Sequence, residues 1–527
     1  MSQSMLLSAT VAGDMDQVAA TEWALSPFAL VDAAGRNCAR VFAEAFPLVF
    51  DTQCLCTGVR RIVALVGSGN NGADALLMLR ALILMGRVDV DECGVLISRV
   101  PASDDASPLA LAFRALQALG VYTNTYTEKV WDAGIIIDGI TGTGLRGPLR
   151  EDAAKLVSSL NTRTARTLRN ADIGLPFVVS VDVPSGCFDE WQAGMPLLRA
   201  DVTLAIEPLK AALYKPLVRA AAGTILPVRE VFAPKQMAAF FRHTEQCIEL
   251  LDWEEAWQRI SVIKPDAYKY ERGVAEIHAG SAGSAGAARI AAQGALAAGA
   301  GITRLIVDDA LYPIVAVNAG GAMVVPTSVA VSEAVAPRFE SDAMLLGPGW
   351  GRGAERVTAL EAALAREAVG IPLILDADAI ALAKGRVFHG NVILTPHAGE
   401  LAAYTGLPKE AALANPYPIL TALAREKQAT ILFKSHVLII AAPDGRVGVV
   451  DGMTPVLSAG GSGDLLAGIC VALAARMKRV NAFDSYICAT CAAALLIEAA
   501  RGVNAFVDPL DLAVHVGKLA GTAWLDK

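Results

Sequence analysis

The stretch GSGNNGAD places polar side chains inside a glycine-rich turn. Gly67, Gly69 and Gly72 match the pattern G-x-G-x-x-G, whose backbone amides hold phosphate where a helix begins. A dehydrogenase also carries an acidic residue at the end of the next strand, about 20 residues further on. Asp89 and Asp91 precede that strand. They lie near the expected distance but at the wrong end of the strand. This position disfavours a redox cofactor, although the turn still suits a phosphate.

Two further stretches carry reactive side chains directly after apolar strands. IIIDGITGTGLRGPLR places Asp138 ahead of a second glycine-rich loop, and VVSVDVPSG places Asp182 and Ser185 at another strand end. The carboxyl ends of parallel strands meet at one edge, so we expect the three stretches to form one crevice. Each aspartate taken alone could instead cap a helix, and the first turn alone could hold no ligand.

A separate cluster lies in SAGGSGDLLAGICVAL. Gly460, Gly461, Ser462 and Gly463 precede an apolar helix, so their amides can form an anion hole, and Asp464 falls in the first turn. An ordinary aspartate, with a pKa of about 3.9, is ionised at neutral pH. It can accept a proton that leaves late in phosphoryl transfer. A helix start with flexible glycines is the alternative.

Other strand ends in the second half supply partners for this cluster: LLGPGWG, LDADAI, LTPHAGE and LFKS. His397 is either a structural histidine or, from its place between a strand end and a glycine, a ligand contact. Lys434 is either solvated or, at a strand end near the anion hole, a contact for nucleotide phosphate.

The elements that must position these residues form two α/β regions. Continuous apolar runs separated by helix-length segments predict parallel sheets covered on both faces. In the first half the runs are 61–67, 93–98, 134–140, 177–184 and 201–206. In the second half they are 274–280, 302–308, 343–349, 372–378, 391–397, 429–435 and 437–443. Residues 232–262 read as a connecting segment, and we place the domain boundary at 240/241.

Composition narrows the class of protein. A chain of 527 residues needs at least two cores, and its 54% hydrophobic content is broken by charges and glycines before a membrane span is reached. The first residues do not resemble a signal peptide. Nine cysteines, among them the pairs Cys54/Cys56 and Cys488/Cys491, show no metal-ligand spacing, and the net charge of −8 lacks a basic block. We expect a cytoplasmic protein that binds neither nucleic acid nor membrane.

GNNGAD, DGITGTGLRGPL and DVPSG together resemble the epimerase domain of bifunctional NAD(P)H-hydrate repair enzymes. The resemblance implies a Rossmann-like fold, a damaged nicotinamide nucleotide as substrate, and a potassium ion held by Asn71, Asp138 and Ser185. It makes Asp182 the acid/base group at the substrate. The substrate would also contact Asn70, Asn71, Gly72, Ala73, Asp74, Gly142, Thr143, Gly144, Leu145, Arg146, Gly147 and Pro148.

GPGWG, DAD, TPHAGE and GGSGD resemble the ADP-dependent NAD(P)H-hydrate dehydratase domain, a ribokinase-like fold. The resemblance implies that Asp464 activates the hydroxyl of the hydrate. The substrate would also contact Ala287, Gly349 and His397, and the adenine nucleotide would contact Lys434, Ser435, His436, Val437, Leu438 and Gly463.

Two three-layer α/β/α domains are thus expected, an epimerase at 1–240 and a dehydratase at 241–527. The first would interconvert the R and S forms of hydrated NADH and NADPH, and the second would dehydrate the S form with ADP as co-substrate and Mg²⁺. We expect a homo-oligomer; whether ATP replaces ADP stays open. The alternative is a kinase for a vitamin precursor or sugar-like alcohol, joined to a nucleotide-binding regulatory module that Ala73 and Ala75, at glycine positions of the family, would have left without catalysis.

Overall fold

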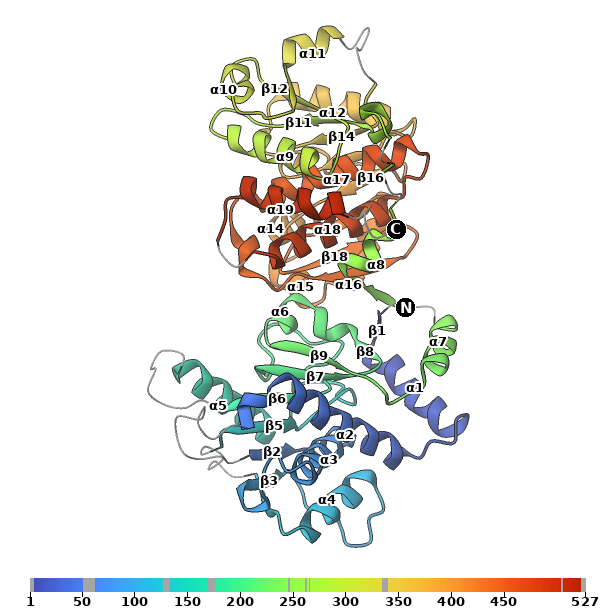
Figure 1. Ribbon diagram of the computed structural model, residues 1–527, viewed down its shortest axis with the longest axis vertical. Coiled ribbons are helices and arrows are strands. Elements are labelled where there is room, and N and C mark those ends of the chain that lie inside the picture. The colour runs from blue at the N-terminus through green and yellow to red at the C-terminus, as the bar shows by residue number, and fades with distance from the viewer. Residues whose placement is uncertain are drawn as a thin grey trace. The chain divides into compact units, whose positions relative to one another are not determined.

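The computed structural model describes residues 4–50, 62–126, 133–167, 176–244, 247–260, 263–264, 266–333, 340–503 and 506–522. It divides into two compact units, Met1–Cys247 and Ile248–Lys527 (Figure 1). The division falls shortly after the boundary expected at 240/241, and the assignment of one activity to each side stays a prediction. Cys54 and Cys56 lie outside the described residues.

The first unit is built around a parallel sheet. Its strands are β2 (Ile62–Val66), β3 (Cys93–Ile97), β4 (Tyr122–Thr125), β5 (Ile135–Gly139), β6 (Phe177–Val181), β7 (Val202–Ile206) and β9 (Thr224–Val228). The same unit also contains β1 (Ser4–Leu7) and β8 (Leu209–Lys210), which pair with each other outside this sheet. The sheet order is β4-β3-β2-β5-β6-β7-β9, and each neighbouring pair is parallel. The chain runs outward from β2 through β3 to β4 and then returns to β5. The switch point therefore lies between β2 and β5, where such sheets bind ligands.

Helices cover both faces of this sheet. They are α1 (Ala9–Thr21), α2 (Pro27–Ala45), α3 (Asn70–Leu84), α4 (Pro108–Ala118), α5 (Glu151–Thr167), α6 (Pro216–Arg219) and α7 (Pro234–Arg242). Side chains alternate along each strand. Ile62, Ala64 and Val66 of β2 pack with α2, α3 and α4, whereas Val63 and Leu65 pack with α5. The expected three-layer α/β/α architecture is confirmed for this unit.

The second unit contains a longer, mixed sheet. Its strands are β10 (Ile248–Leu250), β11 (Val274–His278), β12 (Ile302–Val307), β13 (Met323–Pro326), β14 (Ala343–Leu346), β15 (Leu373–Leu375), β16 (Val392–Leu394), β17 (Thr430–Phe433), β18 (Val437–Ala441) and β19 (Val447–Asp451). The order is β13-β12-β11-β14-β15-β16-β17-β18-β19-β10. Neighbours from β13 to β17 are parallel, while β18 is antiparallel to β17 and to β19. Here the switch point lies between β11 and β14.

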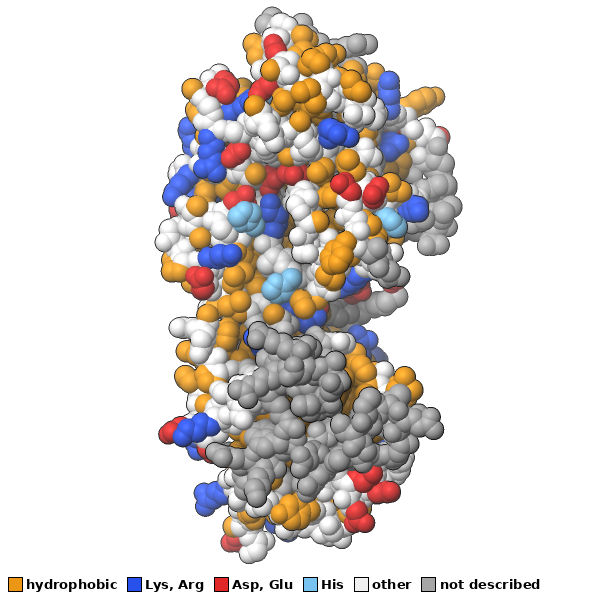
Figure 2. Space-filling model, turned by 90° about the vertical axis from the view of Figure 1, so that its left-hand side faces the viewer, with side chains coloured by type: hydrophobic (Ala, Val, Ile, Leu, Met, Phe, Trp, Pro, Cys, Tyr) orange, Lys and Arg blue, Asp and Glu red, His pale blue; other side chains and the backbone are white. Residues whose placement is uncertain are grey.

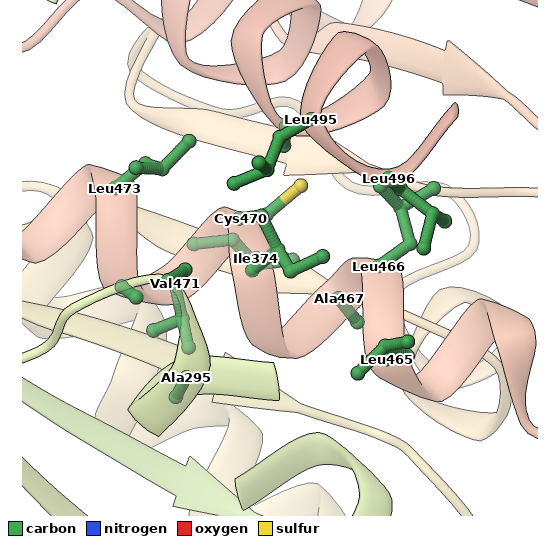
Figure 3. Packing of buried hydrophobic residues seen from close by; sticks show 14 of the residues in the cluster. Ala295, Ile374, Leu465, Leu466, Ala467, Cys470, Val471, Leu473, Leu495 and Leu496 are labelled. Atoms are coloured by element: carbon green, nitrogen blue, oxygen red, sulfur yellow. The ribbon is translucent and has the colours of Figure 1, made fainter. Parts of the chain in front are cut away.

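The helices of the second unit again form two layers. They are α8 (Trp253–Trp257), α9 (Ala285–Ala297), α10 (Tyr312–Ala316), α11 (Thr327–Glu333), α12 (Ala354–Glu367), α13 (Asp378–Leu382), α14 (Ala398–Thr405), α15 (Lys409–Ala414), α16 (Pro416–Lys427), α17 (Ser462–Arg479), α18 (Ser485–Arg501) and α19 (Pro509–Thr522). The helices α9, α17, α18 and α19 share one alanine-rich core with the sheet. Figure 3 shows Cys470 and Leu466 of α17 beside Leu495 and Leu496 of α18, with Ile374 of β15 below them. This packing fixes the helix whose first turn holds Asp464.

The opposite face of the second sheet carries a charged cluster. Glu276 of β11 accepts hydrogen bonds from Ser341 and Arg304, and its carboxylate lies 2.9 Å from Nε2 of His278. Burial alone would raise its pKa, but the bonds from His278 and Ser341 and the charge of Arg366 lower the pKa of Glu276 to about 2. Buried charges persist where such partners satisfy them.

Each apolar run expected to form a strand does so, and most strands end before the run does because its last residues belong to the next turn. The sequence analysis did not identify β1, β4, β8, β9, β10, β13 and β19. Of these, β4, β9 and β13 are outermost strands; β4 is polar, and β9 and β13 each contain a proline, which is typical of edge strands. The buried strand β19 was missed although it is largely apolar, and a glycine interrupts its pattern. The expected connecting segment contains α7, β10 and α8, so much of it is folded. Within the described residues, no helix has the length and apolar character that a membrane crossing requires.

Candidate active sites

A cavity of about 750 Å³ opens in the first unit at the switch point of its sheet. Its walls come from α1, α2, the turn after β2, the loop after β5 and the segments that follow β6 and β7. This volume lies within the usual range for small-molecule pockets, roughly 300–1,000 Å³. The three predicted strand ends therefore do converge on one cavity.

Close backbone contacts explain two glycines of the first turn. A Cβ atom on Gly67 would lie 1.7 Å from the carbonyl oxygen of Ile140, and one on Gly72 would lie 2.6 Å from that of Gly67. Only glycine allows β2, β5 and the start of α3 to approach this closely. Ala73 is buried in the hydrophobic core beneath the turn. It has a negative φ, so its methyl group causes no strain there.

Oxygen atoms gather where β5 and β6 end. The carboxylate of Asp138 is fully buried and accepts hydrogen bonds from Ser185 Oγ at 2.5 Å, Ser185 N at 2.9 Å and Ser180 Oγ at 2.8 Å. Burial raises the pKa of Asp138, although these hydrogen bonds act in the opposite direction. Asn71 donates through Nδ2 to the carbonyl of Thr141, and Ser185 Oγ lies 3.3 Å from the same carbonyl. Asn71 and Ser185 thus meet at one point of the loop.

Asp182 follows β6 in a left-handed backbone conformation, with φ of +65°. Aspartate is one of the few residues that adopt this region without glycine's freedom. The Asp182 amide donates to Leu204, and its carboxylate Oδ1 lies 2.6 Å from Nζ of Lys210, which follows β7. Both side chains are buried and line the cavity.

Two further carboxylates face this ion pair. Asp74 on α3 and Asp16 on α1 both line the cavity. Burial, then the charges of Asp182 and Asp16, raise the pKa of Asp74 well above its usual range. Burial also raises the pKa of Asp16, with Lys210 opposing it. A buried cluster of like charges keeps protons on some of its members, as expected.

Most of the other residues predicted for the first site line the cavity, and two continue the loop beyond it. Asn70, Asn71, Asp74 and the loop residues Gly142, Thr143, Gly144, Leu145 and Arg146 line the cavity. Gly147 and Pro148 continue the loop toward α5. Arg146 donates to the carbonyl of Thr143 at 2.7 Å, which folds the loop back on itself.

In the second unit, Asp464 lies in the first turn of α17, as predicted. Gly461 caps this helix with φ of +94°, a conformation that favours glycine. Burial, then the nearby carboxylate of Asp376, raise the pKa of Asp464 to about 6, although Lys434 opposes them. Asp464 is therefore a better proton acceptor near neutral pH than an ordinary aspartate.

Lys434 lies at the end of β17 and is held by a neighbouring strand end. Its Nζ lies 2.6 Å from Oδ1 of Asp376, which also accepts from Thr395 Oγ1 at 2.6 Å. Glu400 Oε2 is 3.9 Å from the same nitrogen, and a Cβ atom on Gly463 would come within 3.3 Å of it. The ammonium thus lies against the glycine turn that begins α17.

His397 caps α14. Its Nδ1 accepts from the amides of Gly399 at 2.9 Å and Glu400 at 3.2 Å, so the ring proton belongs on Nε2. The side chain is 59% exposed, so a ligand can reach the ring, whose Nε2 lies 3.5 Å from Oε1 of Glu400. A structural role and a ligand contact are therefore compatible in this histidine.

The other residues predicted for the second site lie on the same edge of the sheet. A Cβ atom on Gly349 would lie 2.9 Å from that of Ala287, so these two are neighbours. Lys434 to His436 form the turn from β17 to β18, and Val437 and Leu438 begin β18; Ser435 Oγ accepts from the Val437 amide at 3.1 Å. Val437 and Leu438 point into the core, so only their backbone can reach a nucleotide.

The sequence analysis missed several residues of these sites. Lys210 and Asp16 in the first unit, and Asp376 and Glu400 in the second, belong to no glycine-rich turn. LDADAI and LTPHAGE contained the latter two, so the signal was present, but no role was assigned. For Lys210 the signal was weaker, because one lysine after an apolar strand is common.

Comparison with known proteins agrees with this arrangement. The family described as NAD(P)H-hydrate dehydratase matches residues 275–514, and the family described as YjeF-related protein N-terminus matches residues 27–212. The bifunctional NAD(P)H-hydrate repair enzyme Nnr of Salinibacter ruber is 31% identical over 88% of this chain and 86% of its own. The Gloeobacter violaceus enzyme of the same name is 32% identical, with 85% of each chain covered.

More distant relatives carry the same name. The Nnr enzyme of Escherichia coli is 26% identical over 91% of this chain and 86% of its own. Among solved structures, an ADP/ATP-dependent NAD(P)H-hydrate dehydratase from Bacillus subtilis, co-crystallised with ATP and Mg²⁺, is 23% identical, with a TM-score of 0.45. It covers 52% of this chain and 98% of its own. Matches along both units, at more than 30% identity to full-length relatives, show that the chain belongs to the family of bifunctional NAD(P)H-hydrate repair enzymes.

Proposed function

We propose that the first unit interconverts the R and S forms of hydrated NADH and NADPH, and that the second dehydrates the S form with ADP. The observation that supports this best is the presence of two strand-edge sites, one in each unit, with a buried carboxylate beside a lysine in each. The family relationship agrees with the two activities. Recycling of the unreactive epimer by the first unit explains why the two are fused.

In the first unit, Asp182 is the proposed acid/base group at the hydrated ring carbon. Asn70, Asn71, Asp74 and the loop 142–146 line the cavity around it and would bind the nucleotide. The turn amides and the N-terminus of α3 suit its phosphates.

The oxygen cluster near Asp138 fits the potassium ion that the family resemblance implies. Within the described residues, Asn71 Oδ1 is buried and has no hydrogen-bond partner. Carboxylate, amide and hydroxyl oxygens are suitable ligands for a hard cation, and Asn71, Asp138 and Ser185 would supply one of each. The proposed site contains one carboxylate only, and among the residues that the structure describes no group of three His, Cys, Asp or Glu side chains is placed to hold a metal. A potassium ion here would add positive charge beside the nucleotide.

In the second unit, Asp464 is the proposed base that accepts the proton of the hydrate's hydroxyl. The hydroxyl oxygen then takes the terminal phosphoryl group of ADP and AMP leaves, with Mg²⁺ as the usual companion of nucleotide phosphates. Phosphate leaves more readily than hydroxide, so the C–O bond breaks, the neighbouring ring carbon loses a proton, and the double bond of the dihydronicotinamide ring is restored. Lys434, beside the glycine turn, would contact the transferred phosphate. Ala287, Gly349 and His397 would contact the hydrate.

A mixture of R and S hydrates tests both activities at once. With ADP, the full chain should recover the dihydronicotinamide absorbance of the whole mixture. The Asp182→Asn chain should stop once the S form is consumed, apart from the uncatalysed background. Asp91→Asn, an exposed aspartate away from the cavity, is the matched control. Complete rapid recovery by Asp182→Asn would contradict the assignment, and replacement of K⁺ by choline should slow only the R form.

We also propose that the chain forms a homo-oligomer. Large hydrophobic side chains on α10, α11 and the outermost strand β13 are exposed, including Ile314, Val317, Val329 and Val331. Figure 2 shows hydrophobic side chains gathered at that end of the second unit. Contiguous exposed apolar surface commonly marks an interface. Light scattering should show a smaller assembly for Val317→Glu than for the unaltered chain, and a monomeric unaltered chain would contradict the proposal.

A further inference from the structure

Lys210 and Asp182 form a buried pair on the wall of the first cavity. Lys210 Nζ donates to Asp182 Oδ1 at 2.6 Å and to the carbonyl of Ile206 at 2.8 Å. An ammonium group has three donors. Among the described residues, the third N–H has no acceptor, and since Lys210 lines the cavity, this donor is available to a ligand.

The surroundings of the pair are acidic on several sides. The ionisable groups facing it are Asp16 on α1, Cys38 on α2, Asp74 on α3 and Glu207 after β7. The charge of Lys210 lowers the pKa of each of these groups, against the effect of burial. The ammonium is thus the common electrostatic partner of this cluster.

The reaction proposed for this unit requires a proton donor. Hydration of an enamine leaves the hydroxyl on the carbon bonded to the ring nitrogen. When that hydroxyl leaves, the C–O bond breaks with its electron pair on oxygen, and the nitrogen lone pair forms a C=N bond. The departing oxygen must take a proton to leave as water. An ion-paired carboxylate has none to give, whereas an ammonium does.

We propose that Lys210 is the catalytic acid and base of epimerisation, donating a proton to the leaving hydroxyl and taking one back when water adds to the opposite face. The acid/base role proposed above for Asp182 thus belongs to the Asp182–Lys210 pair, in which Lys210 carries the proton while Asp182 holds the ammonium in place and balances its charge. The cycle consumes no co-reactant, because the proton that leaves Lys210 returns to it. This inference rests on the epimerase function proposed above.

Lys210→Arg separates proton transfer from charge. Arginine keeps the positive charge and can bond Asp182, but it does not lose its proton in proteins. We expect kcat for conversion of the R hydrate to fall by about 10²–10⁴-fold, the usual contribution of acid–base catalysis. Binding of the R hydrate should fall much less than kcat, since the positive charge is kept. Dehydration of the S hydrate by the same polypeptide should be unchanged and serves as the internal control.

A second variant covers the case in which arginine does not fit. Lys210→Ala leaves space for a small cation, so methylammonium should restore turnover of the R hydrate, whereas methylguanidinium should not. Lys215→Arg, a buried lysine outside the cavity wall whose Nζ donates to the Asp189 carbonyl, is the matched control and should keep its activity.

The possible outcomes are distinguishable. If Lys210→Arg keeps its turnover, or methylguanidinium rescues Lys210→Ala as well as methylammonium does, Lys210 acts only through its charge and the inference is wrong. Full activity in Lys210→Arg would also point to Asp74 as the donor. If the unaltered chain converts only the S hydrate, the epimerase proposal itself fails. Loss in Lys210→Arg, together with rescue by methylammonium alone, supports the inference.

Discussion

Replacing Asp464 with asparagine should inactivate the second unit and stabilise it at the same time. Asparagine has the size of aspartate but cannot accept the proton of the hydrate's hydroxyl. Loss of a general base commonly costs about 10²–10⁴-fold in rate. The Lys434–Asp376 ion pair beside the glycine turn remains, so we expect adenine nucleotide to bind with little change.

The gain in stability follows from the raised pKa. Burial and neighbouring carboxylates shift the pKa of Asp464 from 3.8 to about 6. The folded chain therefore binds its proton more tightly than the unfolded chain, so stability falls as pH rises through this window. Each pKa unit is worth about 1.4 kcal/mol, so ionised Asp464 destabilises the fold by up to about 3 kcal/mol. Partial exposure of the site reduces this to about 2 kcal/mol.

Urea unfolding and dehydration assays on the same samples check both effects. At pH 8, Asp464→Asn should raise the free energy of unfolding by about 2 kcal/mol, and the gain should disappear below about pH 4, where the aspartate is protonated in both states. Asp511→Asn places the same change in the first turn of α19, at an exposed position, and should keep its activity and give no gain in the free energy of unfolding. A less stable Asp464→Asn chain, or one with full activity, would refute the reasoning.

Three other predictions address the second unit. Dehydration should lose activity as pH falls through about 6, where Asp464 becomes protonated, and a rate that stays constant down to pH 4 would contradict this. Glu276, with a pKa of about 2 against 4.5, contributes stability that is complete above pH 4.5 and is lost toward pH 2. Its loss is worth about 3 kcal/mol, and Glu276→Gln should flatten the pH dependence of unfolding. Gly468→Ala places a Cβ atom 2.1 Å from the Ala291 carbonyl between α17 and α9, so it should lower Tm by overpacking worth about 1–3 kcal/mol, whereas Gly502→Ala should not.

The sequence predicted most of the strands that lie inside the sheets and the turns that follow them, but it missed the inner strands β10 and β19. Buried parallel strands are apolar along their whole length, so their ends can be located, and ligands bind at those ends. Asp138, Asp182 and Ser185 were predicted in this way, and the structure bonds Ser185 to Asp138 and brings Asn71 and Ser185 to the same carbonyl of Thr141. The outermost strands β4, β9 and β13 were not found, because β4 is polar and a proline interrupts both β9 and β13.

Residues that act through distant partners could not be predicted. Lys210 pairs with Asp182 across 28 positions, and Lys434 pairs with Asp376 across 58. No local spacing marks such pairs, since the sheet order decides which strand ends become neighbours. The wall formed by α1 was missed for the same reason, because Asp16 reaches the cavity only through the packing of the whole unit.

The two sites place a lysine differently with respect to the carboxylate that we propose for catalysis in each. In the first unit Lys210 bonds Asp182 directly, so the pair can give a proton and take it back, as epimerisation requires. In the second unit Lys434 bonds Asp376 instead, and the carboxylate of Asp464 is left with a raised pKa. A phosphoryl acceptor needs a base that takes one proton, and a carboxylate not neutralised by a lysine is the stronger base. The position of one ammonium group thus distinguishes the chemistry of the two units.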